Sequence, residues 1–212
     1  MTTFASYVYQ IYLVNAAKKI HVEISAILDS GRYPLTKSAA ANAICYSRLT
    51  EPMKQLSIRV LILACGNTLR SDDGVGPWLA DWAEQHFAAQ PEIRVISRQQ
   101  WTPDLAVDIS EARSVLFIDC SIESDPGTIQ LRPVEPAVPQ QGLATHHQGA
   151  PELLAFARDL YASSPSSAQL LTIGAGSTEL GEDFSEPVRS ALPQACNLIE
   201  QTVTLALASF ER

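Results

Sequence analysis

Two adjacent carboxylates, Asp72 and Asp73, stand in a glycine-containing loop directly after an apolar run. The apolar run covers residues 60–63, the loop reads CGNTLRSDDGVG over residues 65–76, and Pro77 follows with apolar positions at helical spacing. We therefore expect both carboxylates at a strand-to-helix junction, which is where ligands bind in open α/β sheets. A turn or a helix cap explains one Asp, but a second carboxylate needs solvent or a positive partner.

A third carboxylate and a histidine could complete a metal site with this loop. Asp119 ends the apolar run 115–118, and His146 precedes a segment in which Pro151 opens a predicted helix. If the two runs are parallel strands of one sheet, Asp119 and the first loop face the same crevice. Two carboxylates and one imidazole suit a divalent metal and leave coordination positions for a ligand from outside.

The elements that would position these residues alternate along the chain. From Ile58 onward, short β-branched runs alternate with helical periods, which predicts βαβ units around a mostly parallel sheet. Ser185 is expected to cap the last helix, and Pro193 is expected to kink or restart it. The proline-rich stretch 133–149 predicts a long loop. The expected strands are 58–64, 93–97, 115–120, 128–133 and 169–174, and the expected helices are 76–89, 103–111, 151–162 and 186–208.

Composition and charge exclude several classes of function. The chain has 212 residues and a net charge of −8, which argues against non-specific nucleic-acid binding. The four cysteines show no CxxC spacing, and two of them end predicted buried strands, so a reducing cytoplasm is expected. The apolar start of the chain is interrupted early and lacks a preceding basic region, which indicates neither a signal peptide nor a membrane span. The four cysteines are Cys45, Cys65, Cys120 and Cys196.

The first 52 residues differ from the rest of the chain. They carry a net charge of +2, whereas residues 53–212 carry −10. Our hypothesis is that Met53 begins the functional unit, residues 53–212. The segment 1–52 would then be either a dispensable extension or an artefact of start-site choice.

The chain from about Ile58 to Leu207 resembles the [NiFe]-hydrogenase maturation endopeptidases, which trim the C-terminus of the hydrogenase large subunit. The resemblance rests on several motifs in the right order over about 150 of the 212 residues. They are GNTLRSDDGVGP at 66–77, FID at 117–119, PGT at 126–128, and His146 followed by Gly149 and PELL at 151–154. A match in several parts is more specific than a single glycine motif.

The resemblance implies a fold, an activity and a ligand set. The fold would be a three-layer α/β sandwich of the phosphorylase/hydrolase kind, with a mostly parallel twisted sheet flanked by helices. In that family a first-loop carboxylate, an Asp after a later strand and a His before a helix bind metal. By motif these are Asp73, Asp119 and His146, and the two carboxylates are also the candidate catalytic residues. His147 follows directly, so both histidines are candidates, and the spacing to Gly149 and Glu152 favours His146.

The implied reaction is removal of a short C-terminal peptide from the nickel-loaded large-subunit precursor. The nickel would arrive with the substrate, and we expect a cytoplasmic monomer without nucleic-acid or membrane partners. The alternative is a non-catalytic nickel-binding or chaperone module that docks on the same precursor with the same three ligands. A serine or cysteine hydrolase is disfavoured because no GxSxG elbow occurs and a nucleophilic Cys65 or Cys120 would need a paired histidine. No HExxH, P-loop or dinucleotide motif supports a zinc protease or a nucleotide-binding protein.

Overall fold

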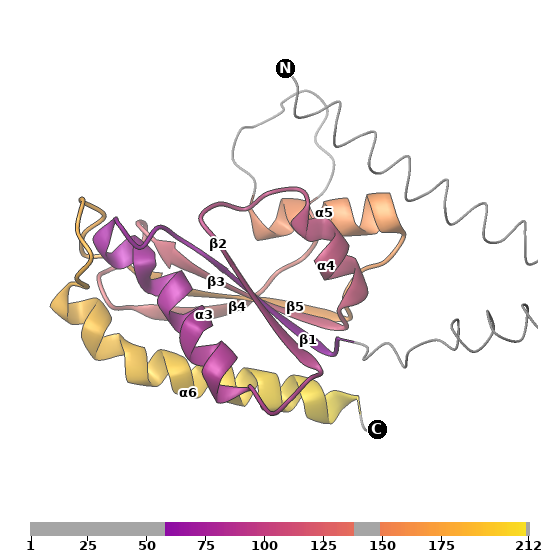
Figure 1. The fold of residues 1–212 in the computed structure, drawn as a ribbon. Helices are drawn as coiled ribbons and strands as arrows, with labels where there is room; N and C mark the ends of the chain where they lie inside the picture. Colours follow the sequence, from indigo (N-terminus) through magenta and orange to yellow (C-terminus); the bar gives the residue numbers. More distant parts are fainter. Residues whose placement is uncertain (1–57, 138–148, 211–212) are drawn as a thin grey trace, which may run out of the picture. The chain divides into compact units, whose positions relative to one another are not determined.

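A five-stranded sheet forms the centre of the fold (Figure 1). The computed structural model describes residues 58–137 and 149–210. The strand order is β2-β1-β3-β5-β4, and every neighbouring pair is parallel except β4 with β5. The mostly parallel sheet expected from the sequence is therefore confirmed. The strands are β1 (Val60–Cys65), β2 (Ile93–Arg98), β3 (Ser114–Ser121), β4 (Ile129–Pro133) and β5 (Ser167–Gly174).

Helices cover both faces of this sheet, as Figure 1 shows. One face packs against α3 and α6, and the other packs against α4 and α5. This arrangement is the predicted three-layer α/β sandwich. A short 3₁₀ helix, η1 (Ser71–Gly74), joins β1 to the first of these helices. The helices are α3 (Val75–His86), α4 (Leu105–Glu111), α5 (Ala150–Tyr161) and α6 (Glu186–Ser209).

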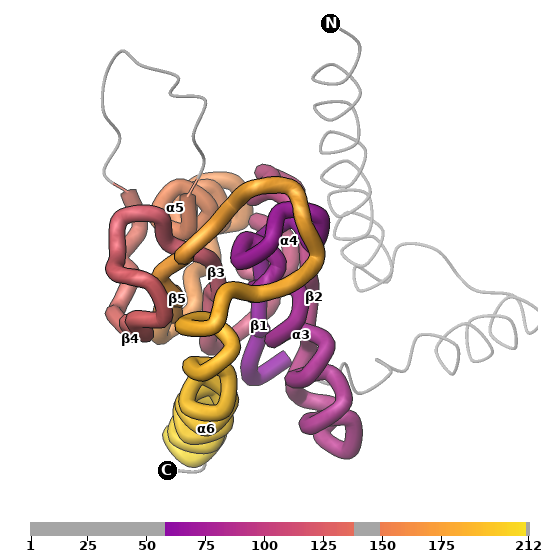
Figure 2. The backbone as a smooth tube through the Cα atoms, turned by 90° about the vertical axis from the view of Figure 1, so that its left-hand side faces the viewer, coloured from indigo at the N-terminus to yellow at the C-terminus, as the bar shows by residue number. Residues whose placement is uncertain are grey.

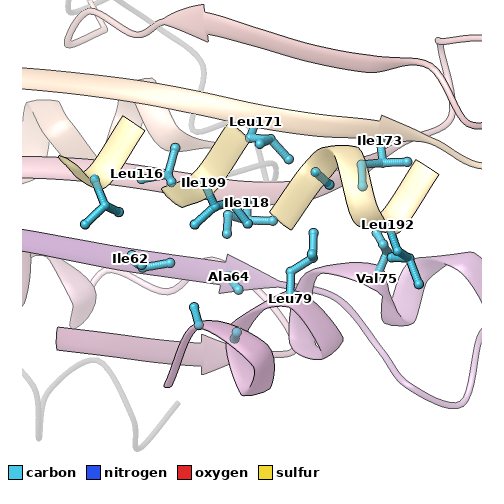
Figure 3. Packing of buried hydrophobic residues seen from close by; sticks show 14 of the residues in the cluster. Ile62, Ala64, Val75, Leu79, Leu116, Ile118, Leu171, Ile173, Leu192 and Ile199 are labelled. Atoms are coloured by element: carbon cyan, nitrogen blue, oxygen red, sulfur yellow. The ribbon is translucent and has the colours of Figure 1, made fainter. Parts of the chain in front are cut away.

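The interior strand β1 shows why the residues 60–65 are all apolar. All six of its residues are buried, because helices cover both faces of the sheet. Ile62 and Ala64 point to the layer of α3 and α6, where they meet Leu79 and Ile199 (Figure 3). Leu61 and Leu63 belong to the cluster on the other face. The alternation of side chains along a strand thus supplies both cores from one run.

One expectation about α6 is wrong, and another is confirmed only for the position of the residue. The helix runs without interruption through Pro193, so the predicted restart is wrong. Pro193 and Arg189 are both exposed, so water can hydrate the Arg189 carbonyl that lacks its helical donor. Ser185 occupies the N-cap position as predicted, but its side chain makes no capping hydrogen bond and is used elsewhere.

Several predicted features lie outside the described residues. They include the N-terminal segment 1–52, Cys45, most of the loop 133–149, and both His146 and His147. Within the two described ranges, no helix is long and apolar enough to cross a membrane.

Candidate active site

The first loop is held in shape by Asn67 and by two glycines. The backbone N–H of Asn67 donates to Oδ2 of Asp73 over 3.0 Å, and its side-chain Oδ1 accepts from the N–H of Leu69, also over 3.0 Å. Gly66 has φ +146°, and a Cβ there would overlap the backbone oxygen of Asp73. A Cβ on Gly76 would overlap the oxygen of Cys65 in the same way. The motif therefore places Asp73 at the carboxyl end of β1, where the chain turns into α3.

The Asp119 carboxylate lies at the carboxyl end of β3, next to the β1 end. Its Oδ2 accepts a hydrogen bond from the indole Nε1 of Trp101 at 3.0 Å, and its Oδ1 accepts from the backbone N–H of Cys120 at 2.8 Å. The Trp101 ring packs edge-on against Phe117, with 5.6 Å between centroids. Burial raises the pKa of Asp119 to about 6, against the opposing effect of its two hydrogen bonds.

Asp73 and Asp119 act on each other electrostatically. Asp119 ends the apolar run of β3 and Asp73 follows β1, and these two strands pair in parallel, so both residues lie at the same edge of the sheet. The charge of Asp73 adds to the increase in the pKa of Asp119. In the described part of the chain, no group donates a hydrogen bond to Oδ1 of Asp73. Two close carboxylates repel each other, and here they keep unused acceptor capacity. Binding of a cation or a proton would therefore stabilise the pair.

The two cysteines beside this pair are neutral thiols. Burial, followed by the charges of Asp119 and Asp73, raises the pKa of Cys65 to about 12. Burial and the same two charges also raise the pKa of Cys120 to about 12. A cysteine nucleophile needs a lowered pKa, so the environment of both thiols disfavours the cysteine-hydrolase alternative.

Asp72 has a structural role that differs from helix capping. It is fully buried, and its Oδ2 accepts hydrogen bonds from the backbone N–H groups of Gly176 and Ser177 and from the hydroxyl of Ser185, at 2.7–2.8 Å. Its Oδ1 accepts from the backbone N–H of Ser185 at 2.7 Å. Burial opposes ionisation of Asp72, but these four hydrogen bonds outweigh it and hold its pKa below the usual value. Asp72 thus fastens the loop before α6 to the first loop.

Glu152, part of the PELL motif, serves the start of α5. Its Oε2 accepts a hydrogen bond from the backbone N–H of Gly149 over 3.0 Å, and Pro151 lies in the first turn. This is the reciprocal half of a capping box. The motif therefore fixes where α5 begins, directly after the segment that carries His146.

The chain is similar in structure to several solved maturation proteases. With the hydrogenase maturating endopeptidase HybD from E. coli it has a TM-score of 0.57 and 17% identity, over 70% of this chain and 93% of that one. With the hydrogenase 2 maturation peptidase from a Thaumarchaeota archaeon the TM-score is 0.52 and the identity 26%, over 69% and 99%. With the [NiFe] hydrogenase maturation protease HycI from Thermococcus kodakarensis the TM-score is 0.54 and the identity 20%, over 68% of this chain and 91% of that one.

The fold is that of the hydrogenase maturation proteases. The resemblance expected from the sequence motifs is therefore confirmed by structural comparison. About seventy per cent of this chain accounts for nearly the whole of each solved maturation protease. The sequence matches no protein-family model, and no curated protein matches it significantly.

Within this maturation-protease fold, the structure brings together part of the expected ligand set. It places Asp73 and Asp119 at adjacent strand ends, whereas His146 lies outside the described residues. The described ranges by themselves hold no group of three metal-binding side chains. Sequence reasoning missed Trp101, which contacts Asp119 from the segment after β2. Its position two residues before the predicted helix 103–111 was the only available signal.

Proposed function

We propose that this chain is an endopeptidase that removes a short C-terminal peptide from the nickel-loaded large-subunit precursor of a [NiFe] hydrogenase. The observation that carries the proposal is the pair Asp73 and Asp119 at adjacent strand ends of a maturation-protease fold. The names of the similar solved proteins support a protease acting in hydrogenase maturation. Active-site residues of α/β proteins lie at this edge of the sheet.

The donor set fits a nickel ion brought by the substrate. Asp73 and Asp119 offer carboxylate oxygens, and His146 would add an imidazole from the segment before α5. Three protein ligands leave positions for groups of the precursor that already hold the metal. The nickel ion would then serve as the mark by which a loaded precursor is recognised.

The carboxylates also have the chemistry for peptide-bond hydrolysis. Water adds to the carbonyl carbon of the scissile bond, and a carboxylate accepts the proton that the water loses. The same group delivers that proton to the leaving nitrogen as the C–N bond breaks, which gives a carboxylic acid and an amine. We assign this proton transfer to Asp119, because burial raises its pKa to about 6, close to neutral pH.

Processing of the precursor tests the proposal directly. Nickel-loaded precursor is incubated with the purified protein, and the mass of the precursor's C-terminal region is followed. Loss of a short C-terminal peptide is expected, with none from nickel-free precursor. Binding of loaded precursor without any mass loss would support the chaperone alternative and contradict the peptidase.

The two histidines give a matched pair of variants for the third ligand. His146→Ala is expected to remove processing, and His147→Ala is expected to keep most of it, because successive side chains of an extended segment point in opposite directions. Circular dichroism confirms that both variants are folded. Processing that survives His146→Ala and is lost in His147→Ala would make His147 the ligand.

We also propose that residues 53–212 are the functional unit. The residues that hold Asp72, Asp73 and Asp119 all follow residue 58, and β1 begins at Val60. A chain that begins at Met53 should therefore match the full chain in thermal unfolding and in precursor processing. An insoluble or inactive shortened chain, under conditions where the full chain works, would contradict this boundary.

A further inference from the structure

A groove of about 530 Å³ runs beside the loop that carries Asp73. Its apolar surface comes from Leu69 in the first loop, Trp78 in α3 and Phe184 before α6. The Trp78 and Phe184 rings meet edge to face with 6.4 Å between centroids. Leu69 is 56% exposed and Trp78 is 40% exposed, although large apolar side chains usually avoid water. A concave surface with exposed aromatic and aliphatic side chains suits an apolar anchor of a partner.

The rim of the groove is acidic. Asp81, Glu182 and Asp183 line it, and Arg189 is the single basic residue among its described lining residues. The guanidinium of Arg189 donates to the backbone oxygen of Phe184 at 3.2 Å, so it helps to hold the groove wall. Three carboxylates around an apolar centre favour a positively charged neighbour on the bound partner.

The two walls of the groove are tied together before any partner binds. The backbone N–H of Ser71 donates to the oxygen of Gly181 at 2.7 Å, and the N–H of Gly181 donates to the oxygen of Leu69 at 3.0 Å. The buried carboxylate of Asp72 accepts hydrogen bonds from Gly176 and Ser185, so it also fastens the loop before α6 to the first loop. Figure 2 shows the loop between β5 and α6, in orange, passing beside the indigo turn before α3. A preformed groove loses little conformational entropy when it binds.

We propose that this groove binds a segment of the polypeptide substrate in which an apolar side chain stands beside a basic one. This inference rests on the proposed function, because the occupant is taken to be the protein that is cleaved. Thr68 and Gly74 line the groove and flank the stretch that bears Asp73. A polypeptide held there would therefore lie beside the loop that carries Asp73. The apolar anchor packs against the rings of Trp78 and Phe184, and the basic side chain meets the acidic rim.

Peptide probes test the groove independently of cleavage. The probes are a fluorescein-labelled peptide of alternating Phe and Lys, the same peptide with Glu for Lys, and the same with Ala for Phe. The Phe/Lys peptide should bind the full chain, and both changed peptides should bind roughly tenfold or more weakly. Equal binding of all three peptides would overturn the proposal.

A matched pair of triple variants separates the rim from general surface charge. Neutralising the three rim carboxylates should weaken binding of the Phe/Lys peptide roughly tenfold and reduce its salt dependence. Neutralising three exposed carboxylates elsewhere should change neither the binding of the Phe/Lys peptide nor its salt dependence. The rim variant is Asp81→Asn, Glu182→Gln and Asp183→Asn, and the control is Asp104→Asn, Glu111→Gln and Glu135→Gln.

Kinetics with the nickel-loaded precursor connect the groove to the substrate. The rim variant and Trp78→Ala should each raise KM roughly tenfold while kcat stays near that of the full chain. Unchanged KM in both variants would overturn the proposal even if cleavage is observed. A dimer in sedimentation that the rim variant lacks would assign the groove to a second copy and overturn it as well. If the full chain fails to cleave the precursor but still binds the Phe/Lys peptide selectively, the proposed function fails while peptide binding by the groove stands.

Discussion

Asp72 and Asp73 are neighbours in the sequence, yet their carboxylates lie in opposite environments. Asp72 is completely buried and accepts four hydrogen bonds from the loop 176–185. Asp73 is partly exposed, accepts one hydrogen bond within the described residues, from the backbone N–H of Asn67, and interacts with the charge of Asp119. A carboxylate with all its acceptors used maintains structure, whereas one with unused capacity beside another charge is available for chemistry.

The pKa values of Asp72 and Asp119 are shifted in opposite directions. Hydrogen bonds hold the pKa of Asp72 below its usual value, so the folded state favours the charged form. Burial raises the pKa of Asp119 to about 6, so the folded state favours its neutral form. Folding is therefore helped by one carboxylate charge and hindered by the other.

The largest expected effect is on the activity of the site pair. Asp119→Asn should lower precursor processing by about 10²- to 10⁴-fold, because it removes a proton acceptor and a negative charge. At pH 7, where Asp119 is charged, the free energy of unfolding should change little, since loss of a desolvated charge offsets loss of one hydrogen-bond acceptor. Processing is followed by mass spectrometry and stability by urea titration. Full activity in this variant would remove Asp119 from the candidate site.

The next largest effect is on stability, at Asp72. Asp72→Asn should lower the free energy of unfolding by about 2–4 kcal/mol, because an amide nitrogen cannot accept the hydrogen bonds that a carboxylate oxygen accepts. Urea titration at pH 7 measures the loss, and Asp73→Asn is the control that should cost much less. Equal costs at the two positions would erase the proposed contrast between them.

The dependence of stability on pH should have opposite signs for the two carboxylates. The contribution of Asp72 is present above its unfolded pKa near 3.8 and is lost as the pH falls through its lower folded pKa. The contribution of Asp119 is present below about pH 4 and is lost as the pH rises through about 6.

The corresponding measurement compares Asp119→Asn with the unchanged chain by urea titration at several pH values. Between pH 4 and pH 7 the variant should gain on the order of 2–3 kcal/mol relative to the unchanged chain. A difference between the two chains that stays constant over this range would show that the pKa of Asp119 is not raised.

The smallest expected effect concerns the indole that contacts Asp119. Trp101→Phe keeps a ring against Phe117 but removes the Nε1 donor, so the pKa of Asp119 should rise further. Processing at pH 7 should fall about three- to tenfold and recover as the pH is raised. The pH profile distinguishes this role from packing alone, which would lower activity equally at every pH.

Local patterns predicted most of the fold because each signal acts over a few residues. The continuous apolar run 60–63 predicts a strand that is buried on both faces, and that strand is observed as β1. Helical periodicity and Ser185 located the start of α6 correctly. The restart expected at Pro193 is not observed. A proline removes the hydrogen bond to the carbonyl four residues earlier, and its cost depends on whether water can reach that carbonyl. Arg189, which carries this carbonyl, is exposed.

The sequence by itself determined that Asp73 and Asp119 stand at strand ends, because periodicity and turn residues are local properties. Only the tertiary structure decided that Asp72 is a structural anchor and that Trp101 contacts Asp119. The partners of Asp72 are 104–113 residues away in the chain, and no pattern within a short window can bring them together. The groove of Trp78 and Phe184 likewise arises only when α3 and the start of α6 lie side by side. Long-range hydrogen bonds and shared surfaces depend on how the layers pack, which follows from burial of the whole sheet.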